Sequence, residues 1–211
     1  MAFTFQNLLD RVFPSSRGEE LKQFAYQEEY NYRRQGTFAE VPHYFDRFRL
    51  LKKGSMRAAH HFITGELPNI YAKLSIYDFH TLGNNKTEKT TIIEIKCVNQ
   101  SFDEFYIRPK NALHGLKSIF LSREPFFPEL TEFNDKYILE YDAFNKANIP
   151  LNSAALRILS NSRDTYIEAK GNQIIFYSKK YRLSPEELEE GVTFAENFVS
   201  KLLFDNTDNF V

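Results

Sequence analysis

An aspartate and a Glu-x-Lys triplet on consecutive predicted strands form the sharpest chemical pattern in this chain of 211 residues. Asp78 lies near the end of one predicted strand, and Glu94 and Lys96 lie on the next. Two carboxylates can hold Mg²⁺, while a lysine stabilises or activates an attacking water molecule. Asp78, Glu94 and Lys96 are therefore candidate catalytic residues for metal-assisted hydrolysis of a phosphodiester.

This pattern resembles the D…ExK set of restriction-type nucleases, but the same residues also fit a strand without catalytic function. Alternation along the strand predicts that Thr91, Ile93 and Ile95 point inward and that Glu94 and Lys96 point to solvent. Lys plus Arg total 27 and Asp plus Glu total 28, so there is no basic surplus to hold a nucleic acid. We therefore expect no catalytic residue and no nucleic-acid partner, with the metal-dependent nuclease as an alternative.

Asp78 has a second interpretation, as one half of a pair with Arg57. The two residues lie at similar distances from a predicted turn around Leu67, so a hairpin would place them opposite each other. Asp78 also continues an apolar strand face, where a carboxylate needs a partner. A cross-strand ion pair is the structural interpretation, and a binding role for Arg57 and Asp78 is the functional one.

The histidines and the single cysteine provide no recognisable metal or cofactor motif. His60 and His61 are adjacent on a predicted strand and should point to opposite faces. Cys97 cannot form an internal disulfide or a cysteine-based zinc site, and its spacing predicts a buried apolar position. Glycine-rich phosphate loops and Gly-x-Ser-x-Gly elbows are absent from the sequence. We expect no cofactor and no metal, with a zinc site built from distant residues as the alternative.

The first 36 residues form a predicted N-terminal helical segment, and residues 37–211 form a predicted α+β domain. An amphipathic helix is expected over Thr4 to Phe13, where it would pack on its own domain, on a partner or on a membrane surface. A second helix is expected from Ser16, followed by a strand or loop over Asn31 to Gln35. A strand over Phe45 to Leu51 carries part of the densest basic cluster, whose members are Arg47, Arg49, Lys52, Lys53 and Arg57. A solvated strand end or a surface for anionic lipid or an acidic partner would explain this cluster.

The rest of the chain predicts roughly seven strands followed by one long helix. Further helices are expected over Asn111 to Leu121 and Asn152 to Leu159. The last helix has the strongest local signal, because Ser184, Pro185 and Glu187 form a capping box with proline in the first turn. The predicted fold class is α+β, mainly an antiparallel sheet or a partly closed barrel, with a long C-terminal helix and short N-terminal helices. The expected strands are Arg57 to Thr64, Ile70 to His80, Thr90 to Val98, Glu104 to Arg108, Lys136 to Tyr141, Thr165 to Ala169 and Gln173 to Lys179.

Several segments, in order, resemble the pattern of an uncharacterised bacterial family whose members are often membrane-anchored. Gly54 to Gly65 resembles the family's element GRSRRARNVLRG, Tyr77 to Phe79 resembles FDY, and Thr90 to Ile95 resembles QTVVLV. Phe105 to Pro109 resembles FxLRP, and Phe133 to Leu139 resembles FSRRYLL. Glu168 to Gly171 resembles EAxG, Ile174 to Tyr177 resembles LLLY, and Leu183 to Leu188 resembles LxPEEL. This resemblance covers most of the chain after residue 45 and implies a shared fold without an established activity. The arginine-rich strand of the family is diluted here, with Arg57 as its only arginine.

Composition favours a soluble, cytoplasmic protein. Hydrophobic residues make up 42% and charged residues 26%, and no run approaches the ~20 apolar residues of a membrane helix. A secretory signal pattern is also missing. The leading hypothesis is a non-catalytic interaction domain that binds a protein partner or sits peripherally at a membrane surface. The alternatives are the nuclease and a small-ligand-binding domain with an aromatic pocket.

Overall fold

The computed structural model describes residues 16–35, 47–52, 55–83, 86–110, 127–142, 149–160, 162, 164–179 and 182–205. Within these residues, eight strands form one antiparallel sheet in the order β1-β2-β3-β4-β8-β7-β5-β6. The strands are β1 (Asn31–Gln35), β2 (Ser55–Leu67), β3 (Ala72–Gly83), β4 (Lys86–Cys97), β5 (Phe102–Pro109), β6 (Tyr137–Asp142), β7 (Tyr166–Gly171) and β8 (Gln173–Tyr177). The α+β class and the antiparallel sheet are confirmed, and the sheet is open rather than closed into a barrel.

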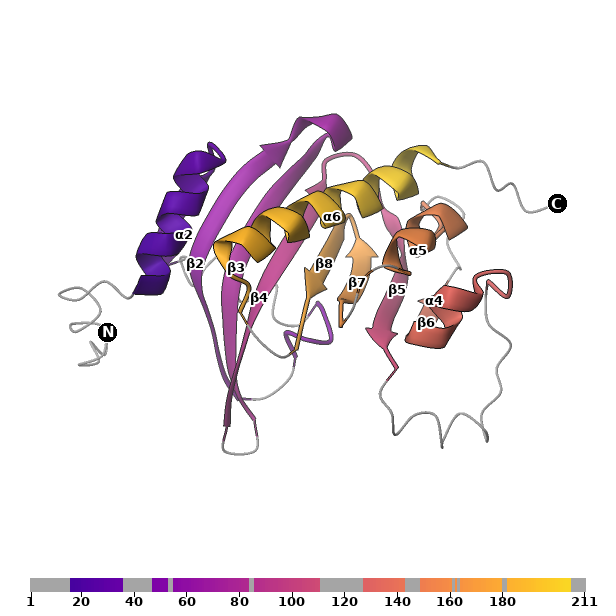
Figure 1. Cartoon of the computed structure of the whole chain (residues 1–211), viewed down its shortest axis with the longest axis horizontal. Helices are drawn as coiled ribbons and strands as arrows, with labels where there is room; N and C mark the ends of the chain where they lie inside the picture. Colours follow the sequence, from indigo (N-terminus) through magenta and orange to yellow (C-terminus); the bar gives the residue numbers. More distant parts are fainter. Residues whose placement is uncertain are drawn as a thin grey trace.

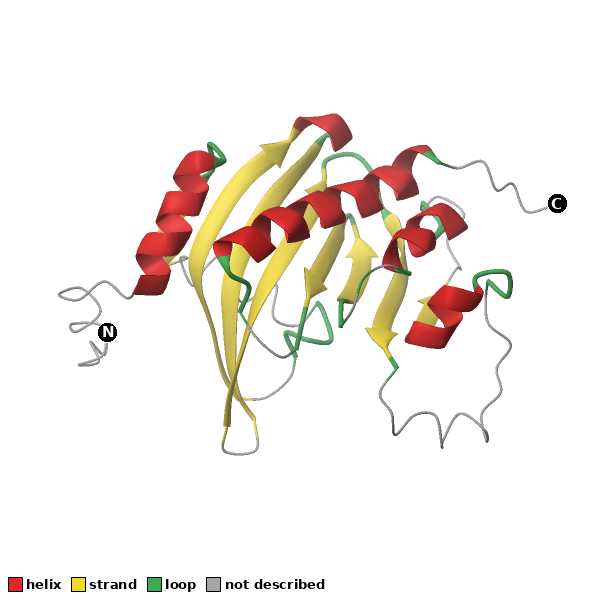
Figure 2. Cartoon of the chain, in the orientation of Figure 1, coloured by secondary structure: helices red, strands yellow, loops and turns green. Residues whose placement is uncertain are grey.

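Helices cover one face of this sheet, and α6 runs across it (Figures 1 and 2). The helices are α2 (Ser16–Gln27), α4 (Thr131–Lys136), α5 (Ser153–Leu159) and α6 (Pro185–Phe204), with the short 3-10 helix η1 (Pro68–Ile70). The predicted capping box of α6 is present, because Ser184 Oγ accepts from the Glu187 amide and the Glu187 carboxylate accepts from the Ser184 amide. The buried stripe of α6 packs with the inner residues of the strands in the main core, which includes Leu188, Val192, Phe198, Leu74, Ile93 and Phe176.

A smaller second core lies on the opposite face of the sheet, under residues 47–52. Here Phe48, Leu50 and Leu51 pack on strand residues that include Phe62, Tyr77, Ile92, Tyr106 and Tyr177. The expected strand over Phe45 to Leu51 is wrong for its described part, because residues 47–52 form turns. The Lys52 amide donates to the Phe48 carbonyl, so the segment closes on itself and does not pair with a strand. It forms the second layer over this face.

The N-terminal elements join the same sheet and the same core. The predicted helix from Ser16 is confirmed as α2; Asn31 to Gln35, expected as a strand or loop, forms the strand β1, which pairs with β2. Leu21 and Phe24 of α2 belong to the main core. The expected helices over Thr4 to Phe13 and Asn111 to Leu121, and the boundary near residue 36, lie outside the described residues.

Across the parts of the chain that are described, no helix is long and apolar enough to cross a membrane.

Candidate functional site

Asp78 and Glu94, the two carboxylates of the nuclease hypothesis, lie on opposite faces of the sheet. The β3–β4 register pairs Asp78 with Thr91, and Glu94 lies three residues further along β4. Because side chains alternate along a strand, Glu94 points away from the face that carries Asp78 and Thr91. The two carboxylates therefore cannot hold one metal ion between them. Among the described residues, no group of three or more His, Cys, Asp or Glu side chains is arranged to bind a metal.

Glu94 is buried, which corrects the expectation that it lies on a solvated face. Its side chain is 5% exposed, whereas Lys96 on the same face is exposed. Gln173 Nε2 donates to Glu94 Oε1 at 2.9 Å, and the Tyr77 hydroxyl donates to Oε2 at 3.3 Å. Burial raises the pKa of Glu94 to about 7, against the smaller opposing effects of these hydrogen bonds. Strand periodicity alone missed this, because a second layer covers the face that the sequence indicated as solvated.

Asp78 pairs with arginines distant in sequence, and Arg57 does not lie opposite it. The β2–β3 register places His60 across from Asp78, since register shifts near Ser55/Ala58 and His60/Ile63 change the spacing expected for a regular hairpin. Arg57 donates to the Leu51 carbonyl at 2.8 Å and so contacts the 47–52 segment. The expected cross-strand placement of Arg57 and Asp78 is therefore wrong.

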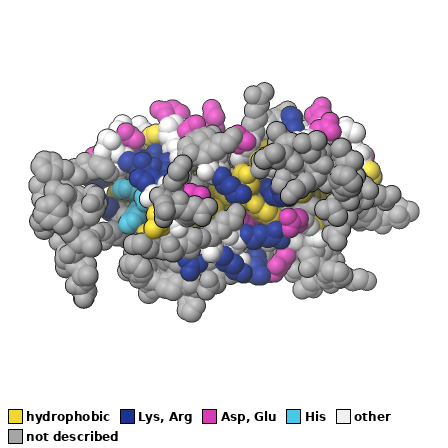
Figure 3. Space-filling view, turned by 90° about the horizontal axis from the view of Figure 1, so that it is seen from below, with side chains coloured by type: hydrophobic (Ala, Val, Ile, Leu, Met, Phe, Trp, Pro, Cys, Tyr) yellow, Lys and Arg dark blue, Asp and Glu magenta, His cyan; other side chains and the backbone are white. Residues whose placement is uncertain are grey.

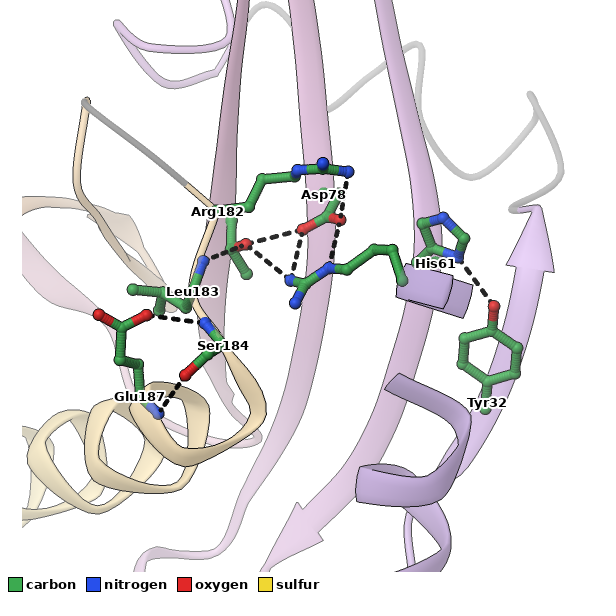
Figure 4. Close-up of polar contacts among 9 residues, drawn as sticks. Tyr32, His61, Asp78, Arg182, Leu183, Ser184 and Glu187 are labelled. Atoms are coloured by element: carbon green, nitrogen blue, oxygen red, sulfur yellow. Dashed lines mark hydrogen bonds and ion pairs between the residues drawn. The ribbon is translucent and has the colours of Figure 1, made fainter. Parts of the chain in front are cut away.

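Asp78 is the centre of a polar cluster beneath the start of α6 (Figure 4). Arg17 of α2 donates to both carboxylate oxygens at 3.2 and 3.3 Å, and Arg182 approaches to 3.8 Å. Thr91 donates to Asp78 at 2.7 Å and accepts from the Leu183 amide at 3.1 Å. Asp78 is 1% exposed, so its charge is compensated almost entirely by protein groups. The cluster joins α2, β3, β4 and the residues before α6, which is the arrangement of a structural clasp.

Three histidines lie close to this cluster without forming a recognisable catalytic set. The Tyr32 hydroxyl and His61 Nδ1 are 2.8 Å apart (Figure 4), and the His60 and His80 rings are 5.3 Å apart. Burial lowers the pKa of His80 to about 4, and neighbouring His60 and Lys89 contribute in the same direction. His61 has a positive φ of 57° at the bulge in β2, which the sequence pattern did not indicate.

A third buried carboxylate, Glu168 of β7, holds the 47–52 segment on the face that also carries Glu94. Glu168 is 4% exposed and accepts from the amides of Arg49 and Leu50 at 2.5 and 3.0 Å. The Tyr177 hydroxyl donates to the same carboxylate at 2.7 Å. Nearby, the Arg47 guanidinium donates to Gln173 Oε1. Glu168 has no signal in the sequence as a site residue, because its amide donors lie far away along the chain in a segment predicted as a strand.

A cavity of about 280 Å³ opens between this segment and strands β5, β6 and β7. Its wall contains charged and aromatic side chains, and two ion pairs lie on its rim: Arg49–Glu140 at 2.5 Å and Lys170–Glu104 at 3.2 Å. Arg49 also lies 4.6 Å above the Tyr106 ring. Seen from below, the molecule shows basic and acidic side chains gathered around hydrophobic ones (Figure 3). The lining residues are Arg47, Phe48, Arg49, Lys52, Glu104, Phe105, Tyr106, Glu140, Tyr141, Glu168, Ala169 and Lys170.

A larger cavity of about 550 Å³ lies on the helical face, between the start of α6, β8 and the end of α5. Its lining is mainly apolar and includes Ile93, Phe176 and Phe194. Its acidic groups are the exposed Glu187 and Glu190, and Glu187 already caps α6. This larger cavity is concave but has few polar groups positioned to bind a ligand. The smaller cavity is concave and has several such groups.

Comparisons with protein-family models, with curated proteins and with solved structures find no match for this chain. The resemblance to the uncharacterised bacterial family stays a prediction.

Proposed function

We propose that this protein is a ligand-binding domain that takes a small polar molecule into the cavity between residues 47–52 and strands β5 to β7. The observation that carries this proposal is the convergence of cationic, acidic and aromatic side chains from distant parts of the chain on one concave site. Ligand sites typically combine a hollow shape with a few positioned polar groups. This is the small-ligand alternative expected from the sequence, with a more polar pocket than its Phe and Tyr content indicated.

The wall of the cavity is held in place before any ligand arrives. Glu168 accepts hydrogen bonds from two consecutive backbone amides of the segment, and Gln173 accepts one from Arg47. These bonds supply the segment with partners that a neighbouring strand would otherwise provide. A wall fixed in this way loses little conformational entropy on binding, which supports affinity from a small contact area.

The side chains around the cavity favour a polar ligand over a purely aromatic one. Alternation along the strands places Tyr106, Glu140 and Glu168 on the cavity face. Phe105 packs in the main core on the other face, so it borders the cavity chiefly through its backbone. The volume of about 280 Å³ lies just below the roughly 300–1,000 Å³ range of ligand pockets, which suits a small ligand.

Binding to a protein partner or a membrane surface, the leading expectation from the sequence, has less support. The exposed large hydrophobic residues of the described parts are Tyr26, Tyr71, Val98 and Phe204. Of these, Tyr71 and Val98 flank the paired residues Ala72 and Cys97 at the ends of β3 and β4. Isolated exposed hydrophobic residues are normal on protein surfaces, and interaction sites usually present a larger contiguous patch.

A fragment screen read by two-dimensional amide NMR tests the proposal. We expect sugars, sugar phosphates, amino acids or small carboxylic acids in the panel to shift the amide signals of Arg49 and Leu50. Glu168→Gln should weaken any such binding by about tenfold, because it loses the charge that holds the wall. Glu88→Gln, at an exposed position of β4, is the matched control. If no fragment shifts Arg49 or Leu50 more than the amides of α5, the proposed function is wrong.

A further inference from the structure

Within the described parts of the chain, not every charged side chain around the cavity has a partner of opposite charge. Four cationic side chains and three carboxylates line it. Arg49 pairs with Glu140 and Lys170 pairs with Glu104, while Glu168 is occupied by backbone amides and a tyrosine hydroxyl. Among the described residues, Arg47 and Lys52 have no carboxylate in ion-pair contact. Four cations against three carboxylates leave the lining with one positive charge in excess, and Arg47 and Lys52 are its two cations without a carboxylate partner among the described residues.

The Arg47 side chain is held in a defined position by Gln173, a buried residue of β8. Its guanidinium donates to Gln173 Oε1, and Gln173 is 1% exposed. Gln173 Nε2 donates to Glu94, so the amide orientation is fixed by partners at both ends. The guanidinium also lies against Gly171, where an added Cβ would approach Arg47 Nη2 to 2.4 Å. A guanidinium has five N–H donors, so those not directed at Gln173 remain to bind an anion.

Glu94 is a buried carboxylate linked to Arg47 through Gln173. The groups that face Glu94 are Tyr77 from β3, Gln173 from β8, Lys96 on its own strand and Arg47 from the segment. An ionised Glu94 offsets part of the positive field in the cavity, and a protonated Glu94 does not. Because the pKa of Glu94 is about 7, the cavity should attract anions more strongly just below neutral pH than above it.

The remaining polar groups on the rim are acceptors. Glu140 and Glu104 are 44% and 55% exposed at the side chain, so their carboxylate oxygens, which pair with Arg49, Arg108 and Lys170, have further lone pairs that can accept from ligand hydroxyl groups. Phe48 and Tyr106 supply the apolar part of the wall. We infer that the ligand is a small hydroxylated anion, a sugar phosphate or a sugar acid, with its anionic group bound by Arg47 and Lys52. This inference rests on the proposed function and specifies its ligand class.

Two matched pairs of probes test the ligand class on the full chain. Ribose 5-phosphate is compared with ribose, and gluconate with glucose, by amide NMR titration at about pH 6 and about pH 8. We expect the anion of at least one pair to bind about tenfold or more tightly than its neutral partner, because charge-assisted hydrogen bonds are stronger than those between neutral groups. The two pairs distinguish a phosphate from a carboxylate as the preferred group. For gluconate, whose carboxylate stays ionised at both pH values, binding should also be tighter at the lower pH; ribose 5-phosphate itself gains a proton near pH 6, so its pH dependence does not report on Glu94 alone.

Three variants and one control variant separate the roles of the charges. Arg47→Gln and Lys52→Gln should each weaken anion binding by about tenfold and leave the neutral sugars unchanged. Lys73→Gln, at an exposed position of β3, controls for a general loss of positive charge. Glu94→Gln should remove the pH dependence of gluconate binding and keep the tighter binding. Thermal melting of each variant verifies that it is folded, so that a loss of binding reports on the site.

The outcomes distinguish the ligand class from the proposed function. If anionic and neutral partners shift the Arg49 and Leu50 amides with equal affinity, the anion assignment is overturned and the ligand-binding function stands. The same holds if only amino acids or amines bind. If Lys73→Gln weakens anion binding as much as Arg47→Gln does, the assignment to Arg47 is wrong. If no probe of any class shifts those amides, both proposals fail.

Discussion

Asp78 on β3 and Glu94 on β4 are buried carboxylates on adjacent strands, yet their surroundings differ in kind. Asp78 faces the helices and contacts two guanidinium groups and a threonine hydroxyl. Glu94 faces the 47–52 segment, and its hydrogen-bond donors are a neutral amide and a neutral phenol. Cationic partners compensate a buried negative charge directly, whereas neutral donors only reduce the cost of burying it.

The difference indicates where a function can reside. A carboxylate paired with two arginines joins secondary-structure elements, and the contacts of Asp78 lie between α2, β3, β4 and the chain entering α6. A carboxylate with neutral partners can gain a proton near neutral pH, and Glu94 is linked through Gln173 to a cation on a cavity wall. Asp78 and Glu94 are both buried acidic residues, so their different roles follow from the face of the sheet on which each lies and not from their residue type.

Removing the Asp78 carboxylate should have the largest effect on stability. Asp78→Ala leaves Arg17 and Arg182 without their shared partner, and breaking a buried ion pair in this way costs about 3–5 kcal/mol. We expect the lower part of that range, since Arg182 can turn to solvent. Urea unfolding monitored by circular dichroism measures the loss, with Glu88→Ala as the exposed control on β4. A cost equal to that of the control would show that the cluster does not act as a clasp.

Glu94→Gln should change how stability depends on pH. The pKa of Glu94 is raised from 4.5 to about 7 in the folded chain, so the folded state keeps a proton that the unfolded state loses. The free energy of unfolding should therefore fall as pH rises from about 4.5 to about 7, by up to about 3 kcal/mol, and this contribution is constant above that range.

The variant has no proton to lose at this position, so it should gain stability relative to the parent protein as pH rises through the same window. Urea unfolding at several pH values between about 4 and about 8 measures the difference, with Glu88→Gln as the control. Curves that stay parallel for parent and variant over that window would contradict the neutral, buried state of Glu94.

Local signals in the sequence predicted much of the fold. The cap at Ser184 and the strand pattern around Asp78 depend on neighbours within a few residues, and both are observed. The site depends on contacts between distant residues, such as Glu168 with Arg49 and Asp78 with Arg17. Alternation correctly separated the two faces of β4, but it could not reveal that residues 47–52 cover the second face. The register shifts in β2 likewise have no signal in strand periodicity.

The two arginines of the clasp should contribute unequally, and Arg182 should have the smallest effect of these changes. Arg17 is 11% exposed and makes two hydrogen bonds to Asp78, whereas Arg182 is 35% exposed and lies 3.8 Å away. Solvent screens the more exposed charge, so Arg182→Gln should cost about 0.5 kcal/mol and Arg17→Gln about 2 kcal/mol. Urea unfolding of both variants in parallel measures the ratio. Equal costs would mean that both guanidinium groups hold Asp78 to the same degree, which the difference in burial and distance argues against.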